Sequence, residues 1–181
     1  MMCVDQRFDS AEETVRMIVD EGGSASAYQA DVTRSADCAA IAREAIVRLR
    51  RIDILVNNVG TGRGDAPPHA IEEDAWDRIM DVNLKSMAMT IRHVLPVMRQ
   101  QKSGAICNIS SLAAIAGHHM VTYEVSKMAV NRLTTVVAAG TVVSSSVSVD
   151  AGPSPSATVG KVIVARGAPS GSVLRPRTCA G

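Results

Sequence analysis

The chain has 181 residues, of which 46% are hydrophobic, so it suits one domain with a substantial core. Its net charge is +1 and only 2% of its residues are aromatic, which argues against nucleic-acid binding. No apolar run reaches the roughly 18 residues that would predict a membrane span, and the N-terminus has no apolar signal core. The cysteines do not have a metal-type spacing, so we expect a cytoplasmic protein.

Short apolar runs alternate with longer helical patterns along the first 140 residues. In chain order we expect a strand over 2–5, a helix over 10–21, a strand over 25–30, a helix over 35–50, a strand over 52–58, a helix over 83–101, a strand over 104–109 and a helix over 122–139. Ser10 and Glu13 form a capping box at the first helix, and Pro96 is expected to kink the third helix or end its regular part. The alternation predicts an α/β fold with a parallel sheet covered by helices on both faces, and ligands beyond the carboxyl ends of its strands.

The end of the chain differs in composition from the rest. The segment 141–181 is rich in glycine, proline and serine and contains no aromatic residue. We therefore expect a domain over 1–140 and a low-complexity, irregular tail over 141–181. The alternation of valine and serine over 142–149 is also compatible with an edge strand.

Polar motifs stand at the ends of the later strands and on the helices after them. The strand 52–58 runs into Asn57-Asn58-Val59-Gly60, where glycine lets the backbone approach a ligand closely. Asn83 opens the helix over 83–101, and Ser111 follows the strand over 104–109. Tyr123 and Lys127 are four residues apart, so they lie on one face of the last helix. A cation one turn away stabilises a phenolate, which suits Tyr123 to proton exchange, while the Ser111 hydroxyl can hold a substrate oxygen.

These motifs, in this order, resemble the short-chain dehydrogenase/reductase family over about residues 2–139. The resemblance implies a Rossmann-like, doubly wound sheet and an NAD(P)-dependent oxidoreductase that interconverts an alcohol and a carbonyl. The family's catalytic residues match Asn83, Ser111, Tyr123 and Lys127. Its cofactor-binding residues match Asp5, Asp31, Val32, Asn58, Val59, Gly60, Tyr123 and Lys127. The acidic residue at position 5 favours NAD, and the nearby Arg7 keeps NADP open.

The resemblance also implies a role for each catalytic residue. Tyr123 exchanges a proton with the substrate oxygen, and Ser111 bonds and polarises that oxygen. Lys127 tunes the phenol and orients the nicotinamide ribose, and Asn83 holds a water that links Lys127 to solvent.

Each of these residues also has a plainer interpretation. Ser110 competes with Ser111 for the catalytic role, and Ser111 is also suited to cap the following loop. Asn83 is also suited to an N-cap, and Asp31 to a turn. His118-His119 fits a loop better than a metal site, because adjacent side chains point apart and no third ligand is near, so we expect no metal.

The resemblance predicts an incomplete fold as well. Family members begin with a strand and a glycine-rich turn that holds the cofactor pyrophosphate, and neither precedes the strand at 2–5. We therefore expect a gap in the middle of the sheet, with unpaired backbone groups on both sides of it, and this truncation argues against activity. The alternative function is a non-catalytic fragment that forms homo-oligomers through its helices over 83–101 and 122–139.

Overall fold

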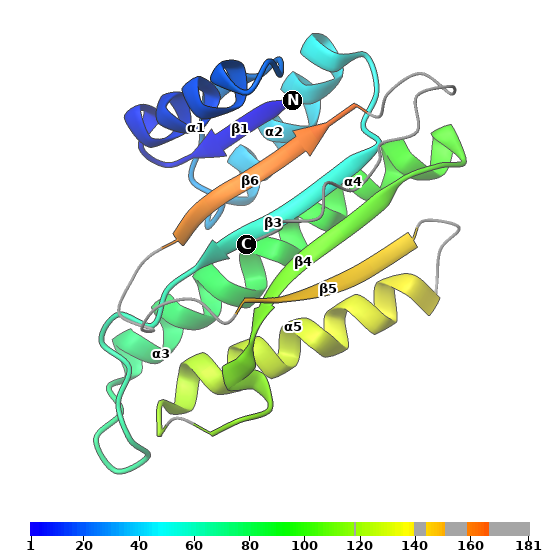
Figure 1. Cartoon of the computed structure of the whole chain (residues 1–181). Coiled ribbons are helices and arrows are strands. Elements are labelled where there is room, and N and C mark those ends of the chain that lie inside the picture. Colours follow the sequence, from blue (N-terminus) through cyan, green and yellow to red (C-terminus); the bar gives the residue numbers. More distant parts are fainter. Residues whose placement is uncertain (118, 140–143, 151–158, 167–181) are drawn as a thin grey trace, which may run out of the picture.

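The computed structural model describes residues 1–117, 119–139, 144–150 and 159–166. It is an α/β fold built on one six-stranded mixed sheet (Figure 1). In chain order its elements are β1 (Met2–Asp5), α1 (Phe8–Asp20), β2 (Ser26–Gln29), α2 (Ser35–Leu49), β3 (Ile54–Gly60), α3 (Glu73–Met80), a π-helical turn (Asp81–Lys85), α4 (Ser86–Gln101), β4 (Ala105–Ser111), a 3₁₀ turn (Leu112–Ala114), α5 (Val121–Ala139), β5 (Ser144–Asp150) and β6 (Val159–Ala165). The predicted alternation of strands and helices is confirmed up to the end of α5, and α4 continues through Pro96 to its end at Gln101.

A strand from the end of the chain occupies the middle of the sheet. The strands lie in the order β2-β1-β6-β3-β4-β5, and all neighbours are parallel except β6, which is antiparallel to both β1 and β3 (Figure 1). Val162 pairs with Val4 on one side and with Asn57 on the other. The prediction of a parallel sheet with a central gap is therefore wrong, because β6 fills that place and pairs with the backbones of both neighbours.

The prediction of an irregular tail does not hold for β5 and β6. The run Val159-Gly160-Lys161-Val162-Ile163-Val164-Ala165 is rich in β-branched residues, which favour a pleated and partly buried strand. Glycine, proline and serine dominate the composition of the tail as a whole, so a prediction based on composition does not detect this short run. The alternative of a strand over 142–149 is close to the observed β5, which pairs with β4 at the edge of the sheet.

The main core lies between the sheet and the helices α2, α4 and α5. All of β1 is buried, because Met2 and Val4 face this core while α1 packs beside the strand on the opposite side (Figure 1). Along β4, by contrast, buried residues alternate with half-exposed ones. Helices therefore cover both faces at β1, whereas at β4 the face turned away from α4 and α5 is half exposed.

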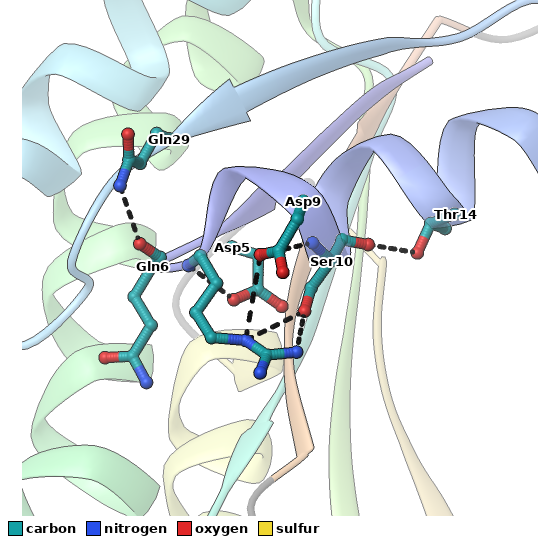
Figure 2. Close-up of polar contacts among 7 residues, drawn as sticks. Asp5, Gln6, Asp9, Ser10, Thr14 and Gln29 are labelled. Carbon is teal, nitrogen blue, oxygen red and sulfur yellow. Dashed lines mark hydrogen bonds and ion pairs between the residues drawn. The ribbon is translucent and has the colours of Figure 1, made fainter.

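The start of α1 differs from the predicted capping box. The helix begins at Phe8, and the buried Ser10 lies inside its first turn. The Ser10 hydroxyl accepts hydrogen bonds from the guanidinium of Arg7 instead of capping backbone N–H groups. Two carboxylates serve this turn, since Asp5 accepts from the Arg7 N–H at 2.9 Å and Asp9 from the Ser10 N–H at 2.9 Å (Figure 2). These acceptors explain why the helix starts earlier than predicted.

Cys38 gives the fold a predicted sensitivity to alkaline pH. This thiol is fully buried on α2 and donates a hydrogen bond to the Val32 carbonyl at 3.2 Å. Burial, with smaller contributions from Asp37 and Asp31, raises the pKa of Cys38 from 9.0 to about 11. Between these values the unfolded chain loses a proton that the folded chain keeps, so the free energy of unfolding falls as the pH rises, by about 3 kcal/mol at most.

Urea denaturation at about pH 8 and about pH 11, in wild type and in Cys38→Ala, measures this contribution. The variant is expected to lose less stability than wild type between the two pH values. Equal losses would show that the thiol does not carry the effect.

Three further observations bear on the class of protein. Cys3, Cys38 and Cys107 are free thiols. None of the described helices is long and apolar enough to cross a membrane. Within the described ranges, no group of three His, Cys, Asp or Glu side chains is placed to hold a metal ion.

Candidate active site

Asn83 joins the loop after β3 to the helix α5. Its side chain is completely buried in the π-helical turn, an irregularity that often accompanies functional sites. Its Oδ1 accepts from the Thr61 N–H at 2.7 Å, and its Nδ2 donates to the Thr61 carbonyl and to Ser126 Oγ, both at 2.9 Å. Asn83 therefore lies inside a helical segment, and its amide fixes the loop against α5 instead of capping a helix.

Lys127 is buried beside Tyr123. Only 4% of the lysine is exposed, so it is not a solvated surface residue. Its Nζ donates to the Ile109 carbonyl at 3.0 Å and lies 5.6 Å from the centroid of the Tyr123 ring. A buried ammonium needs compensating contacts, and here they include a carbonyl of β4 and the aromatic ring on the preceding turn of the same helix. The predicted neighbourhood of phenol and cation is present.

Gly60 makes room for this arrangement. A Cβ atom at Gly60 would lie 3.1 Å from Lys127 Nζ and 3.7 Å from Asn83 Oδ1. The first distance is tighter than most contacts in proteins, so the ammonium would have to move by a few tenths of an ångström to admit a side chain here. The glycine at the end of β3 thus brings the backbone close to two of the predicted catalytic side chains.

The two serines at the end of β4 have different surroundings, because successive residues of a strand face opposite sides of the sheet. Ser110 is buried, and its Oγ donates to the Lys127 carbonyl at 3.0 Å. Ser111 is half-buried, and its Oγ accepts from the Ala113 N–H at 3.2 Å. This bond is the capping contact with the following loop that the sequence suggested as an alternative role for Ser111. The Ser110 hydroxyl is committed to α5, which leaves Ser111 as the more accessible of the two.

A buried polar network stabilises the strands beneath the site. Asn57 Nδ2 donates to Asn108 Oδ1 at 2.8 Å, so the Asn57 amide ties β3 to β4. Thr90 Oγ1 donates to Asn57 Oδ1 at 2.8 Å, and Asn108 Nδ2 donates to Thr134 Oγ1 at 2.9 Å. These bonds link β3 and β4 to α4 and α5. Thr90, Asn108 and Thr134 were not among the predicted site residues. Their one signal in the sequence is a polar side chain at a position of a helix or strand that is expected to be buried.

A hollow lies beyond the carboxyl ends of β1 and β2. Asp5, Asp31, Val32 and Val59 are among its lining residues. Four of the predicted cofactor residues thus lie around one space at the edge where α/β sheets bind ligands. Asn58 and Gly60 do not line it.

The carboxylates of this hollow also have structural roles. Asp31 Oδ1 accepts from the N–H and the hydroxyl of Thr33, at 3.0 and 2.7 Å, so the turn interpretation of Asp31 is confirmed. Asp5 is mostly buried and supports the start of α1 through the Arg7 N–H (Figure 2). These contacts fix both carboxylates at the rim of the hollow.

Comparisons with known proteins agree with this geometry. A family model described as short chain dehydrogenase matches residues 1–152. The 3-oxoacyl-(acyl-carrier-protein) reductase of Staphylococcus epidermidis is 33% identical over 131 residues, which are 72% of this chain and 53% of that protein. A metagenomic short-chain oxidoreductase solved in complex with NADP has a TM-score of 0.73 and 33% identity, covering 81% of this chain and 67% of that one. NAD+-bound xylitol dehydrogenase has a TM-score of 0.72 and 26% identity, covering 75% of this chain and 53% of that one.

The chain spans about half the length of the curated relatives it matches. The family match nevertheless extends over most of this chain, and it includes every residue of the site described above. On sequence and fold together, the chain belongs to the short-chain dehydrogenase/reductase family.

Proposed function

We propose that the chain is an NAD(P)-dependent oxidoreductase that interconverts an alcohol and a carbonyl. The observation that carries this proposal is the buried Lys127 ammonium, 5.6 Å from the Tyr123 ring and held by the Ile109 carbonyl. A cation in this place stabilises the negative charge that develops on the phenol while its proton moves to a substrate oxygen. Membership of the short-chain dehydrogenase/reductase family supports the same chemistry.

Each residue has a distinct part in the proposed reaction. In the reductive direction Tyr123 gives its phenolic proton to the carbonyl oxygen, and the Ser111 hydroxyl donates a hydrogen bond to the same oxygen. A bound nicotinamide would supply the hydride to the carbonyl carbon. Lys127 stabilises the phenolate that remains and orients the nicotinamide ribose.

Asn83 is proposed to hold the water that returns a proton from solvent through Lys127. Both of its amide N–H groups are already used, toward the Thr61 carbonyl and Ser126 Oγ. The remaining acceptor capacity of Oδ1 is the part of the side chain that such a water would meet.

We assign the adenosine end of a nicotinamide cofactor to the hollow beside β1 and β2, because four of the predicted cofactor residues line it. Asp5 at its rim is suited to accept hydrogen bonds from ribose hydroxyls, which favours NAD. Arg7 is the residue that kept NADP open, and its guanidinium is bonded to Ser10 and lies 3.9 Å from the Asp9 carboxylate. An arginine engaged in this way is less available to a 2′-phosphate, so we propose NAD as the preferred cofactor.

Titration of the full chain with NADH and with NADPH, followed by nicotinamide fluorescence, tests the proposal. Saturable binding is expected, with NADH at least about tenfold tighter than NADPH. Turnover of a panel of small alcohols and carbonyls would then define the substrate class. Absence of saturable binding to either cofactor would reject this chain as a working oxidoreductase.

A second candidate function is a non-catalytic module that associates through α4 and α5. It is favoured by exposed apolar side chains on α5, where Val125, Met128 and Val136 are 44%, 50% and 53% exposed. Their spacing places them along one side of the helix, where a second copy of the chain would cover them. Homo-oligomer formation through this surface is compatible with either function.

Met128→Glu is expected to shift the chain from an oligomer to a monomer, because a charge would have to be buried at the contact. Size-exclusion chromatography with light scattering measures the change. Met17→Glu is the matched control, since Met17 is 60% exposed on α1, away from α4 and α5. The same oligomeric state in wild type and both variants would rule out α5 as the contact surface.

A further inference from the structure

The helix that carries Tyr123 takes its N-terminal cap from a distant loop. α5 begins at Val121 and follows Met120, which has no side-chain oxygen for capping. Asp65, in the loop between β3 and α3, supplies the missing acceptors. Its Oδ1 accepts from the Thr122 N–H at 3.1 Å, and its Oδ2 accepts from the Tyr123 N–H at 2.7 Å. The next carbonyl of the loop, at Ala66, accepts from the Val121 N–H at 3.4 Å.

Asp65 is itself held in one orientation. Its N–H donates to the Gly62 carbonyl at 3.1 Å, and its Oδ1 also accepts from the Ala66 N–H at 2.9 Å. Both carboxylate oxygens are therefore engaged, and neither can turn without losing a bond to α5. A carboxylate at this end of a helix is also favoured by the helix dipole, and hydrogen bonds to an ionised acceptor are stronger than neutral ones.

The shape of the loop follows from the residues just before Asp65. Gly64 has a φ of +80°, a left-handed conformation that favours glycine, and a Cβ there would lie 2.7 Å from Arg78 Nη2. The same arginine donates to the Arg63 carbonyl at 2.8 Å. The loop thus passes closely over α3 and turns back toward the first turn of α5.

The other end of the same loop is fixed by Asn83 through Thr61, and Asn83 also reaches Ser126 on α5. Lys127 Nζ adds a bond from α5 to the Ile109 carbonyl of β4. Groups from a loop, a π-helical turn and a strand therefore hold α5 near Tyr123. The main chain of Tyr123 is held on both sides: Asp65 accepts from its N–H, and Ser126 Oγ donates to its carbonyl at 2.7 Å.

We infer that Asp65 is a positioning residue for Tyr123. It holds the N–H of the residue whose phenol is proposed to transfer the proton, and so keeps the first turn of α5 from fraying. Its effect on catalysis rests on the proposed function, because displacement of a proton donor by about 1 Å is sufficient to slow a reaction about 100-fold. Its effect on the helix is independent of any activity.

Amide hydrogen exchange, measured by NMR on the full chain, tests the structural part. In Asp65→Ala the amides of Thr122 and Tyr123 are expected to exchange about tenfold faster than in wild type, while the amide of Val130 keeps its rate. Asp65→Asn retains one acceptor oxygen and is expected to restore part of the protection. Asp77→Asn, which removes one charge from an exposed position on α3, is the matched control and should leave all three amides unchanged.

Steady-state kinetics on the same variants test the catalytic part. For Asp65→Ala we expect a loss in kcat of about 10- to 100-fold, with the Kd for NADH within about twofold of wild type. If the amides of Thr122 and Tyr123 exchange in Asp65→Ala at the same rates as in wild type, the inference is overturned, whether or not the chain is active. Faster exchange with unchanged kcat would overturn the catalytic role. A wild-type chain that binds no cofactor would reject the proposed function and the catalytic role, while the exchange data would still decide the hold on the helix.

Discussion

Tyr123→Phe is expected to lower kcat by about 10²- to 10⁴-fold, the usual contribution of a general acid or base. The substitution removes only the phenolic hydroxyl, and the ring stays beside the Lys127 ammonium. Among the described residues that hydroxyl makes no hydrogen bond, so its loss should not disturb packing. The measurement is kcat in both reaction directions, with the substrate that the panel identifies.

Two controls separate a chemical from a structural effect in this variant. The Kd for NADH should stay within about twofold of wild type, and the thermal midpoint should be unchanged within error. Ser111→Ala should also reduce kcat, by about 10²- to 10³-fold if its hydroxyl holds the substrate oxygen. Wild-type turnover by Tyr123→Phe would exclude the phenol as the proton donor and would leave the buried lysine without a catalytic partner.

The parts of the site that lie close together in the chain could be predicted from the sequence. Tyr123 and Lys127 are one helical turn apart, so their proximity follows from the period of the helix alone. The positions of Asn57 and Ser111 follow from apolar runs that end in polar residues, because such strands share one edge of a sheet. In each case local geometry decides the outcome.

The parts that depend on distant residues could not be predicted in this way. The Asp65 cap binds Thr122 and Tyr123, which lie 57 and 58 positions further along the chain. The sequence around Asp65 contains no pattern that indicates a contact with α5. The capping box at Ser10 failed for a different, local reason, since the helix starts two residues earlier, where the Asp5 and Asp9 carboxylates accept from the Arg7 and Ser10 N–H groups. The place of β6 depends on a pairing partner from the start of the chain, and composition carries no information about pairing.

Val164→Asp is expected to unfold the chain or nearly so, and it tests the central place of β6. Val164 is completely buried and pairs with Met2 on β1 and Leu55 on β3. An unpaired charge at such a site costs about 3–5 kcal/mol, a large share of the roughly 5–15 kcal/mol that stabilises a typical domain. The free energy of unfolding in urea, followed by far-UV circular dichroism, measures the loss.

Ile163→Asp is the matched control, because the same change is made on the same strand one position away. Ile163 faces the opposite side of the sheet and is only partly buried, so a carboxylate there keeps contact with water. Its cost is expected to be at least about 2 kcal/mol smaller than that of Val164→Asp. If both variants lost the same stability, the two faces of β6 would be equally buried, which would contradict the alternation of buried and partly buried residues along this strand. A large difference would show that the C-terminal segment is part of the sheet that positions the site, since β3, which β6 supports, ends at Gly60 beside Lys127.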